Sequence, residues 1–207
     1  MQEKSWYRVS MHMDAPGTLE ALSDEALFAR ARENPVAFGP LVDRYWVKLC
    51  GFVRRTYLFG PEDAQDVVQE ALIKAYRHVH AFDESLSFSA WIYRIVRNAA
   101  VDALRRRAAR PFTVSTDDEE RPIAIVAPDA HAAALTRIEA ESVARIIREL
   151  PVKYREAMVL RDLEGHTYEE IADILKAPKG TVASLVNRGR KMVRERADAI
   201  GIHPYGT

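Results

Sequence analysis

Apolar residues recur every three or four positions through residues 61–79, a spacing that puts them on one buried stripe of an α-helix. The stripe consists of Ala64, Val67, Val68, Ala71, Leu72, Ala75, Tyr76 and Val79. Gly60 and Pro61 mark its start, because proline is favoured at the first helical position. A second stripe follows at Phe88, Trp91, Ile92, Ile95, Ala99 and Leu104. Two long amphipathic helices in succession predict an all-α fold.

The outer faces of these two predicted helices differ in chemistry. The first presents acids, an amide and one apolar residue, at Asp66, Gln69, Glu70, Ile73 and Arg77. The second is basic and aromatic, with Tyr93, Arg94, Arg97, Asn98 and Arg105. An apolar residue on the polar face of the first helix favours a protein partner, although an ordinary solvated face is the alternative. Tyrosine beside arginine suits stacking on unpaired bases and neutralisation of phosphates.

Charge is segregated along a chain whose net charge is zero. The 30 basic and 30 acidic residues cancel, so the total charge alone indicates no partner. Residues 86–112 nevertheless hold six arginines against one acid, and residues 176–196 hold seven basic residues against one acid. Residues 117–129 carry five acids against one arginine. Two basic surfaces flanking an acidic connector favour nucleic-acid binding.

Helix-start signals divide the chain into two predicted helical domains. Residues 1–21 form an N-terminal extension, and a first domain covers residues 22–107. Ser23 is expected to cap its first helix, and Asn34 can cap the next, where Pro40 predicts a kink or a late start. A large apolar face then follows at Leu41, Val42, Tyr45, Trp46, Leu49, Phe52 and Val53. Residues 108–134 show no sustained period and are predicted to be a flexible linker.

The second predicted domain covers residues 135–197, before a tail at 198–207, and its end has the pattern of a helix-turn-helix. Thr136 and Thr167 each open a capping box, with Glu139 and Glu170 respectively. After Pro151 starts a helix, a short helix is expected at residues 168–175, a turn at 176–179 and a long helix to about Arg196. The inward positions of the long helix are Val182, Val186, Gly189 and Val193. Short helix, turn and basic helix predict a reader of duplex DNA.

Three segments carry a family resemblance. The string DVVQEALIKAYR at residues 66–77 and the string WIYRIVRN at residues 91–98 resemble region two of bacterial sigma factors of the extracytoplasmic-function group, also called group four. Residues 150–191 resemble region four of the same group. The resemblance extends over roughly residues 22–195 and implies a sigma factor, which directs core RNA polymerase to promoters and helps to melt them.

The resemblance implies three sets of contact residues. The residues expected to dock on the β′ coiled coil of RNA polymerase are Asp66, Gln69, Glu70 and Ile73. Contact with the minus-ten strand falls to Phe82, Asp83, Glu84, Ser85, Leu86, Ser87, Tyr93, Arg94, Arg97 and Asn98, of which residues 82–87 match a loop that captures a flipped base. Contact with the minus-thirty-five duplex falls to Arg161, Lys179, Thr181, Ala183, Ser184, Leu185, Asn187, Arg188 and Lys191.

Other function classes find little support in the sequence. Cys50 is the only cysteine, which excludes an intrachain disulfide and suits a core thiol in a reducing compartment. The six histidines and one cysteine form no zinc pattern, and no nucleophile is paired with a base. We therefore predict a non-enzyme without metal or cofactor. No apolar run approaches the ~18 residues of a membrane helix, and the start lacks a signal-peptide core, which together predict a cytoplasmic protein.

The predicted partners are core RNA polymerase, through its β′ and β subunits, promoter DNA and an anti-sigma protein, since family members are commonly held inactive in that way. Two rival functions remain open. An autonomous helix-turn-helix regulator would explain residues 167–196 but not the pair of helices at 61–107. A sigma-like decoy that sequesters an anti-sigma protein would suit Ala183 and Leu185, which stand where the family usually has basic residues.

Overall fold

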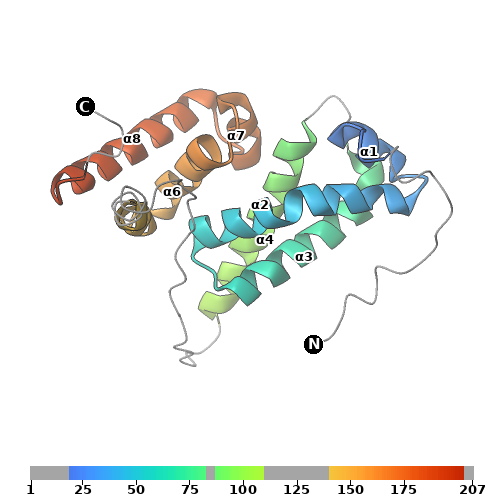
Figure 1. Cartoon of the computed structure of the whole chain (residues 1–207), viewed down its shortest axis with the longest axis horizontal. Helices are drawn as coiled ribbons and strands as arrows, with labels where there is room; N and C mark the ends of the chain where they lie inside the picture. The colour runs from blue at the N-terminus through green and yellow to red at the C-terminus, as the bar shows by residue number, and fades with distance from the viewer. Residues whose placement is uncertain (1–18, 83–86, 110–139, 203–207) are drawn as a thin grey trace, which may run out of the picture.

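The computed structural model describes residues 19–82, 87–109 and 140–202, and all regular structure in these ranges is helical. Figure 1 shows two lobes: a first lobe with α1 to α4, and a second lobe with α6, α7 and α8. The predicted all-α class is confirmed. The predicted linker, apart from its first two residues in α4, and the capping box at Thr136 lie outside the described residues.

The first lobe consists of α1 (Asp24–Arg30), η2 (Pro35–Phe38), α2 (Gly39–Tyr57), α3 (Pro61–Arg77), η3 (Val79–Ala81) and α4 (Phe88–Ala109). The predicted caps are confirmed, because Ser23 Oγ accepts from Ala26 N at 3.2 Å and the Asn34 side chain accepts from Val36 N at 3.1 Å. The late start at Pro40 is also confirmed: a short 3₁₀ helix comes first, and Pro40 lies in the first turn of α2.

The core of the first lobe is built around aromatic rings from α1, from α4 and from Phe82, which follows η3. The ring of Phe28 on α1 lies 5.2 Å from that of Phe82, 4.9 Å from Phe88 and 5.0 Å from Trp91. Tilted and edge-on contacts of this kind are favoured by the quadrupoles of the rings. Phe82 is only 4% exposed. Its ring is part of the core, and a role of residues 82–87 in base capture stays a prediction.

Most residues of the predicted apolar stripes on α3 and α4 are buried. On α3 the stripe is buried except for Tyr76, which is 36% exposed and packs on Phe38 at 5.4 Å between ring centroids. On α4, Ile95 and Leu104 are half-buried, and the other predicted positions are buried. Tyr93, predicted to lie outside, is only 2% exposed. The reason is tertiary: the second lobe covers this side of α4.

The second lobe contains a helix whose described part covers residues 140–148, then α6 (Val152–Met158), which continues as the π-helix η4 (Val159–Leu163), followed by α7 (Tyr168–Leu175) and α8 (Lys179–Asp198). The helix-turn-helix is confirmed, and all its predicted inward positions on α8 are buried. Gly189 allows close packing there, because a Cβ atom would lie 2.5 Å from Met158 Sδ.

The capping box of α7 has a measurable role in stability. Thr167 Oγ1 accepts from Glu170 N at 3.2 Å, and the Glu170 carboxylate accepts from Thr167 N at 2.9 Å. We expect Thr167→Ala to lower the free energy of unfolding by about 1 kcal/mol, because the orphan amide of the first turn loses its acceptor. Urea unfolding followed by circular dichroism measures this. Thr181→Ala, at an exposed threonine within α8, is the control and should leave stability nearly unchanged.

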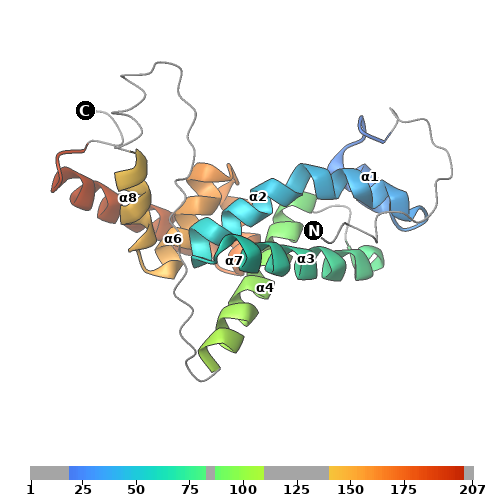
Figure 2. The same cartoon turned by 60° about the horizontal axis from the view of Figure 1, so that its bottom comes forward.

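The two lobes pack directly against each other, α4 against α7 and α2 against α6 and η4. Buried apolar residues of the first lobe form one continuous cluster with seven from the second: Ala157, Val159, Leu160, Ile171, Ile174, Val182 and Val186. A separate small cluster, Ile146, Leu150, Met158, Val193 and Ala197, holds the far side of the second lobe. Figure 2 shows the C-terminal half of α4 pointing away from the second lobe.

Candidate nucleic-acid interface

The acidic face of α3 is exposed as predicted. Asp66, Gln69 and Glu70 are exposed, and Ile73 lies among them with 44% of its surface in solvent. Glu70 reaches Arg106 at the end of α4, with 3.1 Å between Oε2 and the guanidinium. An apolar residue surrounded by exposed acids is suited to docking on a basic protein surface with an apolar centre.

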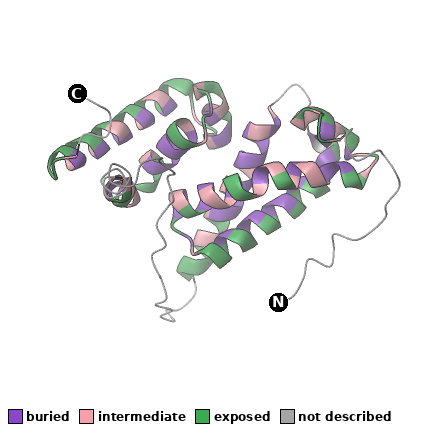
Figure 3. Cartoon of the chain, viewed as in Figure 1, coloured by how far each residue is buried: buried purple, intermediate pink, exposed green. Residues whose placement is uncertain are grey.

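The C-terminal half of α4 carries exposed positive charge. Arg105, Arg106 and Arg107 have side chains that are 77%, 57% and 65% exposed. In Figure 3 this end of α4 is coloured as exposed. Nearer the lobes, Asn98 is exposed and Arg94 is half-buried. These side chains are accessible to phosphates, which is the first requirement for binding DNA.

Other members of the predicted minus-ten set are covered by the second lobe. The Tyr93 hydroxyl donates to Glu164 Oε2 at 2.6 Å, and the ring lies 4.6 Å from that of His166. Burial, reinforced by Glu164, raises the pKa of Tyr93, so the phenol remains a proton donor. This corrects the expectation that Tyr93 is exposed. Ser87 donates to Glu170, and residues 83–86 lie outside the described residues.

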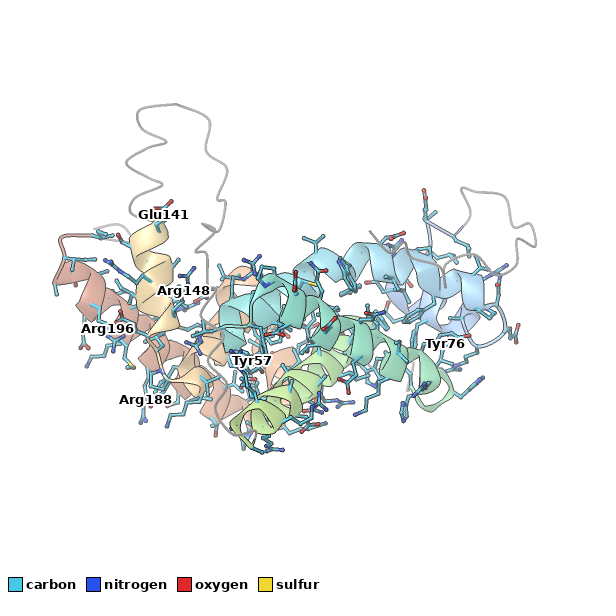
Figure 4. All side chains as sticks on the ribbon, turned by 90° about the horizontal axis from the view of Figure 1, so that it is seen from below. Tyr57, Tyr76, Glu141, Arg148, Arg188 and Arg196 are labelled. Carbon is cyan, nitrogen blue, oxygen red and sulfur yellow. The ribbon has the colours of Figure 1, made fainter. Side chains whose placement is uncertain are left out.

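Two glutamates of the second lobe form a buried polar network with the first. Glu164 accepts from Tyr93 and from Arg55, the latter at 2.5 Å, and its side chain is 4% exposed. Glu156 accepts from the Tyr57 hydroxyl and from Arg97 Nε, the latter at 2.7 Å. Figure 4 places Tyr57 where the first lobe meets the second. Sequence reasoning missed these residues, because no local pattern pairs groups about a hundred positions apart.

The recognition helix α8 presents the predicted polar face. Thr181, Ser184, Asn187, Arg188 and Lys191 are all exposed, and Lys179 is exposed while paired with Glu169 on α7. Ala183 and Leu185 are half-buried, and Leu185 packs against the core. The apolar side chain of Leu185 therefore serves packing.

Arg161 is held within its own lobe. Its guanidinium donates to the carbonyl oxygen of His166 at 2.8 Å and lies 5.0 Å from the centre of the Tyr168 ring. The side chain is half-buried. These contacts fix the η4–α7 connection, and a DNA contact by Arg161 stays a prediction.

His166 is a buried titratable group at the contact between the lobes. It is 4% exposed, and it faces Tyr93, Glu164 and Glu170. Burial lowers the pKa of His166, with Glu170 and Glu164 partly opposing the shift. The folded state therefore binds this proton less readily than the unfolded chain does. Above the ordinary histidine pKa of about 6.5, titration of His166 does not change the free energy of unfolding. As the pH drops below that value, the contribution of His166 lowers the free energy of unfolding.

We expect the melting temperature of the wild-type chain to fall more than that of His166→Gln when the pH is lowered from about 7.5 to about 5.5. The imposed cost is at most about 1.4 kcal/mol for each pH unit between the two pKa values. Scanning calorimetry at a series of pH values measures it. Equal losses in the two proteins would show that His166 does not cause the dependence.

Other kinds of site find no support in the described residues. No group of histidine, cysteine, aspartate or glutamate in the described ranges is arranged to hold a metal ion. Cys50 is half-buried, and burial raises the pKa of its thiol to about 11, which makes it a poor nucleophile. Among the described helices, none combines the length and apolar character needed to cross a membrane.

Comparison with known proteins settles the family. The family model of Sigma-70 region 2 matches residues 41–110, and that of Sigma-70, region 4 matches residues 140–193. The chain is 35% identical over 184 residues to the ECF RNA polymerase sigma-E factor of Haemophilus influenzae, with 86% of this chain and 96% of that protein covered. The chain belongs to the ECF sigma factors. The sigma-E factor of Escherichia coli is 36% identical over 194 residues, covering 87% of this chain and 97% of its own length.

Solved structures agree with this family. The structure of CnrH in complex with the cytosolic domain of CnrY matches this sigma factor with a TM-score of 0.62 and 28% identity, covering 85% of this chain and 97% of that one. The sigma factor RpoE of Bartonella quintana, in complex with the anti-sigma factor NepR, shares the fold at a TM-score of 0.59 and 22% identity. As a sigma factor, the protein is a non-enzymatic transcription initiation factor that acts with core RNA polymerase on promoter DNA.

Proposed function

We propose that this sigma factor docks on the β′ subunit of core RNA polymerase through the acidic face of α3 and holds the melted minus-ten strand with α4. The observation that carries the proposal is that one lobe presents both an acidic surface and a basic surface. Asp66, Glu70 and Ile73 are exposed on α3, while arginines crowd the exposed part of α4. A protein that joins an enzyme to DNA needs both surfaces on one rigid body.

The second lobe is proposed to read the minus-thirty-five duplex with α8. The exposed side chains Thr181, Ser184 and Asn187 are able to reach base edges, while Arg188 and Lys191 supply charge for phosphates. Leu185 packs against the core and Ala183 is half-buried, so the exposed polar face of α8 is formed by the other five residues. The decoy alternative is left to the binding assay below.

Regulation by an anti-sigma protein in the cytoplasm is part of the proposal. CnrH, a match at 28% identity, was solved with the cytosolic domain of CnrY. A partner that covers the exposed α3 face or the basic end of α4 would block polymerase or DNA. We propose that such control serves an envelope or other stress response, as membership of the ECF sigma factors implies.

A mobility-shift assay separates this function from its rivals. Duplex fragments of the host genome are mixed with core polymerase alone, with the chain alone and with both together. We expect a retained subset of fragments only when both are present. Specific retention by the chain alone would indicate an autonomous regulator, and a chain that neither binds core enzyme nor retains DNA would indicate a decoy.

A further inference from the structure

Three residues of the proposed minus-ten surface are each held by a glutamate of the second lobe. The contacts run from Ser87 Oγ to Glu170 Oε1 at 3.0 Å, from Tyr93 Oη to Glu164 Oε2 at 2.6 Å, and from Arg97 Nε to Glu156 Oε1 at 2.7 Å. All three glutamates lie on the second lobe, and all three partners lie on α4 or immediately before it. Tyr93 and Arg97 lie one helical turn apart, so Glu164 and Glu156 cover the same face of α4.

The two buried glutamates are bound in the same manner. Each carboxylate accepts from one tyrosine hydroxyl and one arginine of the first lobe: Glu164 from Tyr93 and Arg55, and Glu156 from Tyr57 and Arg97. The glutamate side chains are only 4% and 8% exposed. Such charges are tolerated in a dry interface only when their partners are in place.

These donors are the kind that nucleic acid requires. Arginine and tyrosine donate to phosphate oxygens as they do to carboxylate oxygens, and an open tyrosine ring can stack on a base. Tyr93 is 2% exposed and its ring contacts His166. Neither a base nor a phosphate can reach Tyr93 or the paired face of Arg97 while the lobes are in contact.

We propose that the second lobe is an intramolecular inhibitor of the minus-ten surface, in which Glu156 and Glu164 occupy the donors that the unpaired promoter strand needs. This rests on the proposed function of α4 and adds its regulation. The unpaired strand and the second lobe then compete for α4. The apparent affinity for the strand equals the intrinsic affinity multiplied by the fraction of molecules in which the lobes are undocked. The α3 face and the polar face of α8 stay exposed, so polymerase docking can precede opening.

Distance measurement by pulsed electron spin resonance tests the docking in the full chain. Spin labels are placed at Glu62→Cys on α3 and Ala199→Cys after α8, in a Cys50→Ser background; both labelled positions are exposed. We expect Glu156→Gln/Glu164→Gln to replace a single narrow distance distribution with a longer and broader one, because Arg55 and Arg97 lose their buried counter-charges.

A matched control removes the same charge without touching the contact between lobes. Asp162 pairs with Arg190 and Glu169 with Lys179, both inside the second lobe. Asp162→Asn/Glu169→Gln should therefore keep the narrow label-to-label distance distribution of the wild type. Because Glu156→Gln/Glu164→Gln could disturb folding, Arg55→Gln/Tyr57→Phe breaks the same pairs from the first lobe, at residues outside the predicted minus-ten set. Circular dichroism establishes that each variant is folded.

Fluorescence anisotropy with a labelled single-stranded oligonucleotide of random sequence tests the competition. Each interface variant is expected to bind this probe about ten-fold more tightly than the wild type and the control. An unchanged distance in the folded interface variants, or a longer distance without tighter DNA binding, would overturn the proposal. The distance measurement uses neither polymerase nor promoter, so failure to bind polymerase would refute the proposed function and leave this result readable.

Discussion

The double substitution Asp66→Lys/Glu70→Lys is expected to abolish co-purification of the chain with core RNA polymerase. Two exposed acids on the same face as Ile73 become bases, so attraction to a basic partner becomes repulsion at short range. The fold should survive, because exposed charges, including the pair of Glu70 with Arg106, contribute roughly 0 to 1 kcal/mol. Affinity chromatography on tagged core enzyme, with thermal melting of the variant, measures both effects.

The matched control is Glu62→Lys/Asp63→Lys. It reverses two exposed charges on the same helix, and Asp63 bridges to Arg107 at the end of α4 much as Glu70 does to Arg106. Polymerase binding should be largely retained in the control. If both double variants bound equally well while folded, the acidic face of α3 would not be the docking surface.

The second large effect is expected from Arg94→Ala/Asn98→Ala. These residues lie one helical turn apart on α4, so they share a face. Promoter binding by holoenzyme should change little, because α8 is the helix proposed to contact duplex DNA. Strand separation should fall by ten-fold or more, since a hydrogen bond that involves a charged group contributes about 1.5 to 3 kcal/mol. Permanganate reactivity of thymines near the start site measures the melted fraction.

The control for this variant is Arg105→Ala/Arg107→Ala, which removes more positive charge from the same helix at exposed positions. If general attraction to DNA were responsible for melting, the control would lose as much permanganate reactivity as Arg94→Ala/Asn98→Ala, or more. We expect melting to be largely preserved in the control. Normal melting in Arg94→Ala/Asn98→Ala would show that this face of α4 does not hold the strand.

Local sequence patterns were sufficient for most helices. Pro61 at a first helical position, the capping box of Thr167 and the caps at Ser23 and Asn34 depend on contacts within four residues, and each is confirmed. The exposed faces of α3 and α8 were also predictable, because a regular period places their side chains without knowledge of neighbours.

The errors came from contacts between distant parts of the chain. Tyr93 carries a hydroxyl and sits among arginines, so its helical position alone favours solvent, but Glu164 and His166 bury it. Phe82 follows a helix end like a loop residue, yet its ring joins the aromatic core. No local pattern predicts the roles of Glu156 and Glu164, because the tyrosine and arginine partners of each lie far away in the sequence and meet it only in the folded chain.

Run-off transcription by purified core polymerase on fragmented host DNA, followed by mapping of transcript 5′ ends, tests the central claim most directly. With the chain present, we expect new and discrete 5′ ends that share upstream sequence elements. These ends should be absent without the chain and with Asp66→Lys/Glu70→Lys. The same 5′ ends with and without the chain, or DNA bound by both proteins without any new transcript, would contradict the claim that this chain directs transcription initiation.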